Sequence, residues 1–150
     1  MLATVQRVSE ASVIINDLEI SSIKKGVLIF VCVEQHDTSQ TVKEMINKIY
    51  NFKMLDGSKG ITSSSLKNQN EDILIVSQFT LFGSIKKGMK PSWSKAADPT
   101  TAHSLYNQFI DICKEKKDIN IATGVFGADM DINSINDGPF TLVIDTKKRE

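Results

Sequence analysis

The 150-residue sequence is 41% hydrophobic and carries 18 lysines plus arginines against 18 aspartates plus glutamates. This length allows one sizeable core and is short for two independent domains, so we expect one domain over residues 1–150. The balanced charge gives no indication of nucleic acid, and any such partner must bind a local patch. No stretch approaches the roughly 20 apolar residues of a membrane helix, and no signal peptide opens the chain. We therefore expect a cytoplasmic protein with no membrane partner.

The patterns of metal, nucleotide and disulfide sites are missing from the sequence. Cys32 lies in an apolar run and Cys113 in a helical pattern far from it, so we interpret both as structural thiols. His36 and His103 have no carboxylate or cysteine partner at ligand spacing, and we expect a structural or surface role for each. The motifs H-E-x-x-H, G-x-S-x-G and G-x-G-x-x-G do not occur. We expect neither a metal nor a cofactor.

The first third of the chain predicts a hairpin followed by a buried strand. Residues 2–15 alternate between apolar and polar side chains, Asn16-Asp17 is a turn signal, and residues 18–23 read as a returning strand. Residues 27–33 form a continuous apolar run of strand length. Such a run is typical of a strand covered on both faces, which makes it the best candidate for a central strand.

Two amphipathic helices are predicted. Asp37 or Thr38 can cap the first, and Asp98 caps the second, where Pro99 occupies the first helical position. Apolar residues recur at helical spacing in both segments: Val42, Met45, Ile46, Ile49 and Tyr50 in the first, and Ala102, Leu105, Tyr106, Phe109, Ile112 and Cys113 in the second.

The remaining elements are a loop and further strands. Residues 56–72 read as a loop with one short helical turn near Leu66, and residues 72–76 as a strand that runs on into residues 77–81. After Ile119, an alternating strand from Thr123 to Ile135, a turn at 136–139 and a last strand at 140–145 predict a second hairpin-like pair. Two helices among about seven strands indicate an α/β domain with a mixed, largely antiparallel sheet and a barrel-like core, rather than a doubly wound nucleotide fold.

The segment Ser77-Gln78-Phe79-Thr80 is a candidate for chemistry. It places two hydroxyls, an amide and an aromatic ring at the exit of a buried strand, where a loop presents backbone N–H groups to a ligand. The alternative is a strand end with polar residues that stabilise a turn. The residues alone leave both interpretations open.

The segment Asn136-Asp137-Gly138-Pro139 has two interpretations as well. Glycine and proline punctuate most turns, so a tight turn explains it. Glycine also permits close backbone approach to a ligand, and an X-Pro bond can be held cis, which aims carbonyl oxygens where trans backbone does not.

A basic loop is predicted at residues 83–95. It holds four lysines, among them Lys86, Lys87 and Lys90, and no acidic residue. These ammonium groups can bind phosphates while Trp93 packs or stacks. A solvated loop with one anchoring aromatic residue is the alternative.

Five segments, taken together and in order, resemble the D-aminoacyl-tRNA deacylase family over essentially the whole chain. Each is a weak match alone, and their order and spacing make the resemblance specific. They are residues 6–13, 77–81, 91–97, 123–130 and 136–139.

The resemblance implies an enzyme that hydrolyses the ester of D-aminoacyl-tRNA, and of glycyl-tRNA, for chiral proofreading in translation. It implies tRNA as partner and a homodimer in which Gly138-Pro139, with a cis peptide bond, enters the partner's active site. It also implies the site residues, which are Ser77, Gln78, Phe79 and Thr80 as the catalytic set, and Arg7, Ala102, Phe126, Met130, Gly138 and Pro139 as the substrate-binding set. Arg7 would help to hold the Gly138-Pro139 segment.

The residues also limit the mechanism. No base lies next to Thr80 in the sequence, so we expect no acyl-enzyme. An aminoacyl ester is already activated, and we expect attack by water with backbone N–H donors near Phe79 and Thr80, assisted by the ribose 2′-OH. The carbonyls of Gly138 and Pro139 would accept the α-amino group and crowd out an L side chain, since a hydrophobic pocket alone separates similar shapes poorly.

Two other functions stay open at this point. A nucleic-acid-binding module without catalysis would use Lys86, Lys87 and Lys90 and would survive loss of Thr80 or enlargement of Gly138. An unrelated ester hydrolase that uses Thr80 as nucleophile would lose activity with that hydroxyl alone.

Overall fold

The structure is a computed structural model that describes residues 1–116 and 118–147. Short connections join the strands and helices, apart from the longer loops around residues 83–98 and 124–130. The elements are β1 (Leu2–Ile15), β2 (Leu18–Ile23), β3 (Gly26–Cys32), α1 (Ser39–Asn51), β4 (Lys53–Gly57), β5 (Gly60–Ser65), the 3-10 helix η1 (Leu66–Asn68), β6 (Asp72–Ser77), the 3-10 helix η2 (Phe79–Phe82), α2 (Pro99–Lys114), β7 (Ile121–Thr123) and β8 (Asp131–Asp145).

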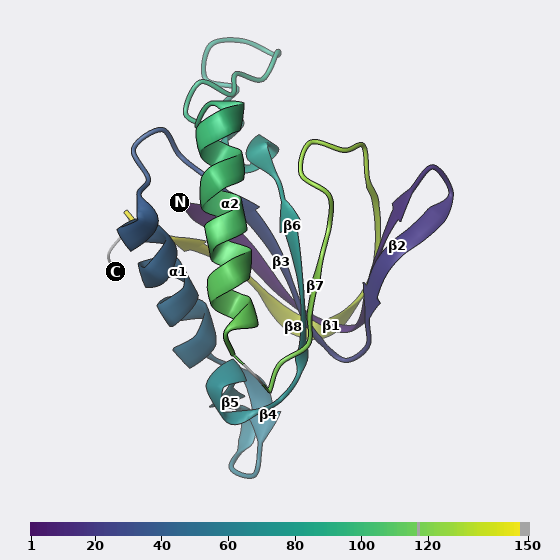
Figure 1. The fold of residues 1–150 in the computed structure, drawn as a ribbon. Helices are drawn as coiled ribbons and strands as arrows, with labels where there is room; N and C mark the ends of the chain where they lie inside the picture. The colour runs from purple at the N-terminus through teal and green to yellow at the C-terminus, as the bar shows by residue number, and fades with distance from the viewer. Residues whose placement is uncertain (117, 148–150) are drawn as a thin grey trace.

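One mixed sheet forms the centre of the molecule. Its strand order is β2-β1-β3-β6-β7, and β8 pairs with β1; the β3–β6 and β6–β7 pairs are parallel and the other pairs of this sheet antiparallel. The two ends of this order approach each other, since Ser21 Oγ of β2 donates to the carbonyl of Thr123 on β7 at 2.7 Å. The sheet is therefore nearly closed into a barrel, with α1 and α2 side by side against it (Figure 1). The predicted fold class is confirmed.

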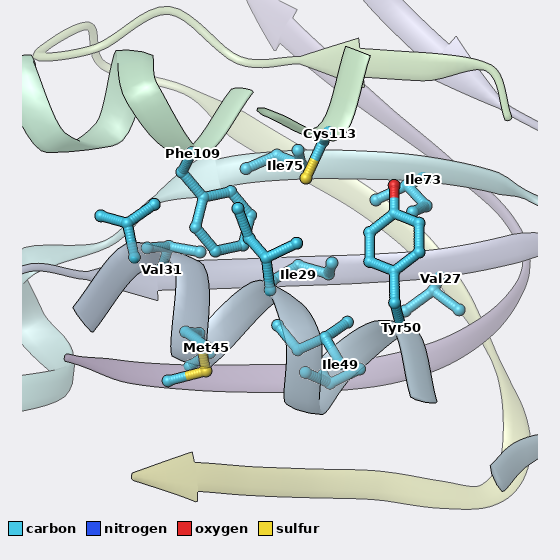
Figure 2. Packing of buried hydrophobic residues seen from close by; sticks show 14 of the residues in the cluster. Val27, Ile29, Val31, Met45, Ile49, Tyr50, Ile73, Ile75, Phe109 and Cys113 are labelled. Carbon is cyan, nitrogen blue, oxygen red and sulfur yellow. The ribbon is translucent and has the colours of Figure 1, made fainter. Parts of the chain in front are cut away.

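Strand β3 is the central strand, as predicted. Val27, Ile29 and Val31 face the helices, where they pack with residues of α1, α2 and β6 in the larger core (Figure 2). Leu28 and Phe30 point the other way, into the interior of the curved sheet. A continuous apolar run is thus explained by burial on both faces.

Both helices begin at the predicted caps. The Thr38 side chain accepts from the backbone N–H of Thr41, and the Thr41 hydroxyl accepts from the N–H of Thr38, which completes a capping box. The Asp98 carboxylate accepts from the N–H of Thr101, and Pro99 stands at the start of α2. Among the described residues, no helix has both the length and the apolar character that crossing a membrane requires.

Phe109 joins α2 to the sheet, and its loss should destabilise the fold strongly. Its side chain is fully buried among residues of α1, β3 and β6. We expect Phe109→Ala to lower the free energy of unfolding by about 3–5 kcal/mol. The change removes buried apolar surface, and it also leaves a cavity that the neighbouring side chains fill only partly. Denaturant unfolding followed by circular dichroism measures this, with exposed Asn107→Ala as control; a loss no larger than the control's would contradict the packing.

The predicted loop at 56–72 is wrong for most of its length. Residues 53–57 and 60–65 form the antiparallel hairpin β4–β5. Gly60, the first residue after the hairpin turn, has a φ of +116°. The buried positions of β5 include Ser64 and Ser65. The segment therefore lacks the alternation of large apolar side chains from which a strand is predicted. The short helical turn at Leu66 is confirmed as η1.

The predicted hairpin at the C-terminal end is also wrong. Strand β8 runs without a turn from Asp131 to Asp145 and pairs with β1 on both sides of the Gly-Pro segment. Gln6 pairs with Thr141 and Val8 with Asn136, so residues 137–140 bulge out opposite Arg7. Because β1 is long enough to pair with both halves, a bulge accommodates the proline, which has no N–H for the ladder.

Two strand boundaries differ from the prediction. Strand β6 ends at Ser77, and residues 79–82 form η2 instead of continuing the strand. Strand β7 ends at Thr123, and residues 124–130 are a loop that returns to β8. In both places the chain leaves the sheet earlier than the sequence pattern predicts.

Candidate active site

A pocket of about 550 Å³ opens where the parallel strands β3 and β6 end. Strand ends, η2, the first turns of α2 and the loop 124–130 enclose it, so segments far apart in the sequence meet there. The residues that line it are Val31, Cys32, Val33, Val76, Ser77, Gln78, Phe79, Trp93, Ala96, Ala97, Pro99, Ala102, Tyr106, Phe126, Gly127, Ala128, Asp129, Met130 and Ile132. This volume lies within the usual range of small-molecule sites.

The sheet positions the polar segment at the mouth of this pocket. Ser77 is the last residue of β6 and pairs with Val31, and the N–H of Gln78 donates to the Val31 carbonyl at 2.8 Å. The chain then turns into η2, and the Gln78 amide donates to the Thr80 hydroxyl. Ser77, Gln78 and Phe79 line the pocket, whereas Thr80 is exposed and does not.

Two backbone donors are free at this turn. The first N–H groups of a helix have no acceptor within the helix, and Phe79 and Thr80 are the first residues of η2. Within the described part of the chain neither N–H group finds an acceptor. A pair of adjacent donors can stabilise a developing negative charge on an oxygen.

Apolar and aromatic side chains make the walls. Phe126 stacks on His103 with the ring centroids 4.5 Å apart and the planes at 6°, and the Tyr106 ring is tilted against Phe126 at 5.7 Å. Phe79 and Trp93 meet edge to face at 5.6 Å. These walls suit the apolar part of a ligand, and His103 acts here as a packing partner of Phe126.

Cys32 lines the pocket but is unsuited to act as a nucleophile. Burial raises the pKa of its thiol to about 12, so the thiol stays protonated at neutral pH. Its Sγ donates to the Phe79 carbonyl at 3.4 Å, which ties β3 to η2. This contact is the structural role expected for the Cys32 thiol. No cluster of side chains suited to a metal ion is found in residues 1–116 and 118–147.

Arg7 and the Gly-Pro segment form a second cluster, separate from the pocket of the same chain. The buried guanidinium donates from Nε to the Asp137 carbonyl at 3.1 Å and from Nη2 to the Gly138 carbonyl at 3.0 Å. The Gly138-Pro139 bond is cis, and both residues are exposed on the bulge of β8. Neither they nor Arg7 line the pocket. The predicted catalytic and substrate-binding residues thus fall into two groups, one around the pocket and one around Arg7.

Family membership follows from the comparison with known proteins. The family model described as D-Tyr-tRNA(Tyr) deacylase matches residues 4–145. The chain belongs to this deacylase family. It is 44% identical to the D-aminoacyl-tRNA deacylase of Thermosipho melanesiensis and 44% identical to that of Clostridium novyi, over 99% of this chain and of each relative. The prediction of a D-aminoacyl-tRNA deacylase, a hydrolase that acts on aminoacyl-tRNA, is confirmed.

A solved structure supports the fold of this deacylase. It is that of a protein named "c-Myc DNA Unwinding Element Binding Protein", which is 33% identical and superposes with a TM-score of 0.91 over 99% of this chain and 100% of its own. The similarity therefore extends from the central sheet to both helices and to the segments around the pocket.

The basic loop of this deacylase rises from the mouth of the pocket. Ser84 and Ser92 exchange backbone hydrogen bonds of 2.9 Å and close the loop, which projects beyond the start of α2 in Figure 1. Lys86, Lys87 and Lys90 are exposed, and none has a carboxylate partner within the described residues. They lie apart from the pocket lining.

Sequence reasoning missed two residues that support these clusters. Asp56 of β4 accepts from Arg7 Nη1 at 3.0 Å, and it lies in a segment predicted as loop. Tyr106 was predicted only as part of an apolar face, yet its buried hydroxyl donates to the Ile75 carbonyl of β6 at 2.9 Å beside the pocket. A tyrosine among aliphatic core positions is the signal for such a bond, whereas nothing in the sequence singles out Asp56.

Proposed function

We propose that the pocket at the ends of β3 and β6 hydrolyses the ester of D-aminoacyl-tRNA in the cytoplasm and releases free tRNA and the D-amino acid. The observation that carries this proposal is the meeting of Ser77, Gln78 and Phe79 with apolar walls from α2 and the loop 124–130 in one pocket, in a chain of the deacylase family. Removal of D-amino acids from tRNA is chiral proofreading in translation.

Positioning and backbone donors suffice for the chemistry. Water attacks the ester carbonyl, the N–H groups of Phe79 and Thr80 stabilise the oxyanion, and the bond to the ribose oxygen breaks. The departing ribose oxygen takes up the proton that the attacking water loses, and the neighbouring 2′-OH assists. No histidine or carboxylate contacts the Thr80 hydroxyl among the described residues, while Gln78 donates to it, so the hydroxyl lacks the base that a nucleophile of this kind needs.

Removal of the Thr80 hydroxyl separates the two mechanisms. We expect Thr80→Ala to lower kcat for D-tyrosyl-tRNA by less than about tenfold, the cost of one neutral hydrogen bond. Loss of a true nucleophile costs on the order of 10⁴-fold or more. Single-turnover deacylation measures the change, and trapping of a covalent adduct on Thr80 would refute attack by water.

Chiral selection depends, in this proposal, on a second copy of the chain. Gly138 and Pro139 are exposed and do not line their own pocket, and we place them in the pocket of the partner in a homodimer. Arg7 occupies one lone pair of the Gly138 carbonyl, and the second lone pair remains for the substrate's α-amino group. The Gly138-Pro139 backbone, placed against the Cα of the substrate amino acid, leaves no space for an L side chain. Glycine has no side chain to exclude, so glycyl-tRNA should be hydrolysed too.

The basic loop is proposed to hold tRNA phosphates. Lys86, Lys87 and Lys90 lie on the loop that leaves the pocket beside Trp93, so an RNA whose end enters the pocket passes them. We expect the triple change of these lysines to glutamine to raise KM with kcat nearly unchanged. The slope of log(kcat/KM) against log[salt] should become shallower by about two to three, since each phosphate contact contributes about 0.7–0.9.

The control for this experiment removes the same charge elsewhere. Lys53, Lys59 and Lys67 are exposed and lie away from the loop, and their change to glutamine should leave the salt slope nearly as in the wild type. Equal slopes for both triple variants would rule out phosphate contacts by the loop.

A binding module without catalysis is the second candidate, favoured by the similarity to a DNA-unwinding-element-binding protein at 33% identity and by the lysines of the loop. Deacylation of matched D-tyrosyl-tRNA and L-tyrosyl-tRNA, with a chelator present, distinguishes the functions. Selective loss of the D ester supports the deacylase. Retention of both esters with tRNA still bound supports the module, and equal loss of both indicates an unselective hydrolase and contradicts the role of Gly138.

A further inference from the structure

Arg7 of β1 hydrogen-bonds both the β4–β5 hairpin and the Gly-Pro segment. The Arg7 residue is 4% exposed, and its guanidinium hydrogen-bonds two elements, β4 and β8. Its Nη1 donates to Met54 O at 3.3 Å and to Asp56 Oδ1 at 3.0 Å, both on β4. Its Nε and Nη2 donate to the carbonyls of Asp137 and Gly138 at 3.1 and 3.0 Å.

A guanidinium is a rigid planar fork, so the bonds on one end fix the direction of the other. The two acceptors on β4 hold Nη1 from one side. With that end fixed, Nε and Nη2 have one orientation in which both carbonyls on the bulge of β8 are reached. Release of the β4 end would let the fork rotate and would free the carbonyls with it.

Asp56 is itself held in place by the hairpin. Its Oδ1 also accepts from the N–H of Thr62 on β5 at 3.2 Å, and its carbonyl accepts from the Gln69 amide. The backbone N–H of Thr62 and the charge of Arg7 keep the pKa of this carboxyl below its usual value. The acceptor is thus ionised at neutral pH and fixed in direction.

We propose that Asp56 is a positioning residue that sets the direction of the Gly138 carbonyl through Arg7, and thereby contributes to discrimination between D and L esters. This inference rests on the proposed role of Gly138. Asp137 Oδ2 lies 3.3 Å from Arg7 Nε, but it belongs to the bulge itself. Asp56 is therefore the carboxylate that ties the bulge to a separate element.

A purely structural role predicts something different. The Asp56 side chain is 53% exposed, whereas the Arg7 side chain is 5% exposed. When the Asp56 carboxylate is lost, Arg7 keeps the carbonyls of Met54, Asp137 and Gly138 as acceptors. If Asp56 only stabilises the position of the β4–β5 hairpin, its loss lowers the unfolding midpoint. The ratio of the rates on D and L esters then stays at the wild-type value. A positioning role changes that ratio at a nearly constant midpoint.

The experiment compares Asp56→Ala, Asp56→Asn and the control Asp111→Ala, an exposed aspartate of α2, in the full-length protein. Each is tested for kcat/KM on D-tyrosyl-tRNA and L-tyrosyl-tRNA and for its unfolding midpoint. We expect Asp56→Ala to lower the D-to-L ratio about tenfold or more, as small displacements of a binding group do. Asparagine keeps the Oδ1 acceptor, so Asp56→Asn should restore most of the ratio, and Asp111→Ala should match the wild type.

Two results would overturn the inference. In the first, Asp56→Ala keeps the wild-type D-to-L ratio of kcat/KM, whereas Arg7→Ala loses the preference for the D ester. The other is an equal loss in Asp56→Ala and Asp56→Asn that follows a fall in the unfolding midpoint. Failure of the proposed function is seen separately, as an absence of D selectivity in the wild type or as an unaltered ratio after a change of Gly138.

Discussion

Alanine at position 138 should lower kcat/KM for D-tyrosyl-tRNA on the order of 100-fold, which is the cost of a displacement of about 1 Å in a binding site. In the proposed dimer the backbone of Gly138 lies against the substrate Cα, where a methyl group occupies the space of the α-amino group. The carbonyl geometry that rejects L esters is disturbed with it. Rates on D-tyrosyl-tRNA, L-tyrosyl-tRNA and glycyl-tRNA measure both effects.

The change at Gly138 is well suited to this test because the chain itself has room for it. A Cβ built there meets only Asn136 Oδ1, at 4.0 Å, and the backbone is outside the positive-φ region. We therefore expect the unfolding midpoint to stay at the wild-type value. Ser134→Ala, on the same strand and exposed, is the matched control. Wild-type rates and wild-type L rejection in Gly138→Ala would remove this residue from the site.

Local patterns predicted the buried strand and the polar segment that follows it. The apolar run before Ser77 marks a buried strand, which was predicted to run on through residues 77–81. In the structure the strand ends at Ser77, and Ser77, Gln78 and Phe79 line the pocket. The caps at Thr38 and Asp98 are equally local. Such features follow from neighbouring residues and need no knowledge of the tertiary structure.

The rest depends on contacts between distant residues, which patterns do not reveal. Phe126 enters the pocket from a loop whose alternation resembled a strand. The Gly138-Pro139 pair has the composition of a turn, yet β1 pairs with β8 on both sides of it and makes it a bulge. Asp56 is joined to Arg7 by a hairpin whose buried positions are partly serines. Its contact with Arg7 becomes visible only when the three-dimensional structure is known.

A large side chain at position 102 should block the pocket. Ala102 lies in the first turns of α2, half-buried, and lines the cavity with Phe126 and Met130. We expect Ala102→Phe to lower kcat/KM for D-tyrosyl-tRNA on the order of 100-fold, with a smaller effect on glycyl-tRNA, because the added ring competes for space with the substrate side chain. Ala102→Ser, which adds one oxygen, is the control. An equal loss on both substrates would indicate damage to the fold in place of a blocked pocket.

The two variants together test whether the site is shared between subunits. Ala102→Phe has a blocked pocket and an intact Gly138, whereas Gly138→Ala has an intact pocket and an altered bulge. If Gly138 enters the partner's pocket, a mixed dimer contains one competent site, made by the pocket of one chain and the glycine of the other. Equal mixing after dissociation and reassociation should then recover about a quarter of the wild-type rate, because half of the dimers are mixed and each has one of two sites. If Gly138 serves its own pocket, every site carries a defect, and mixing recovers nothing.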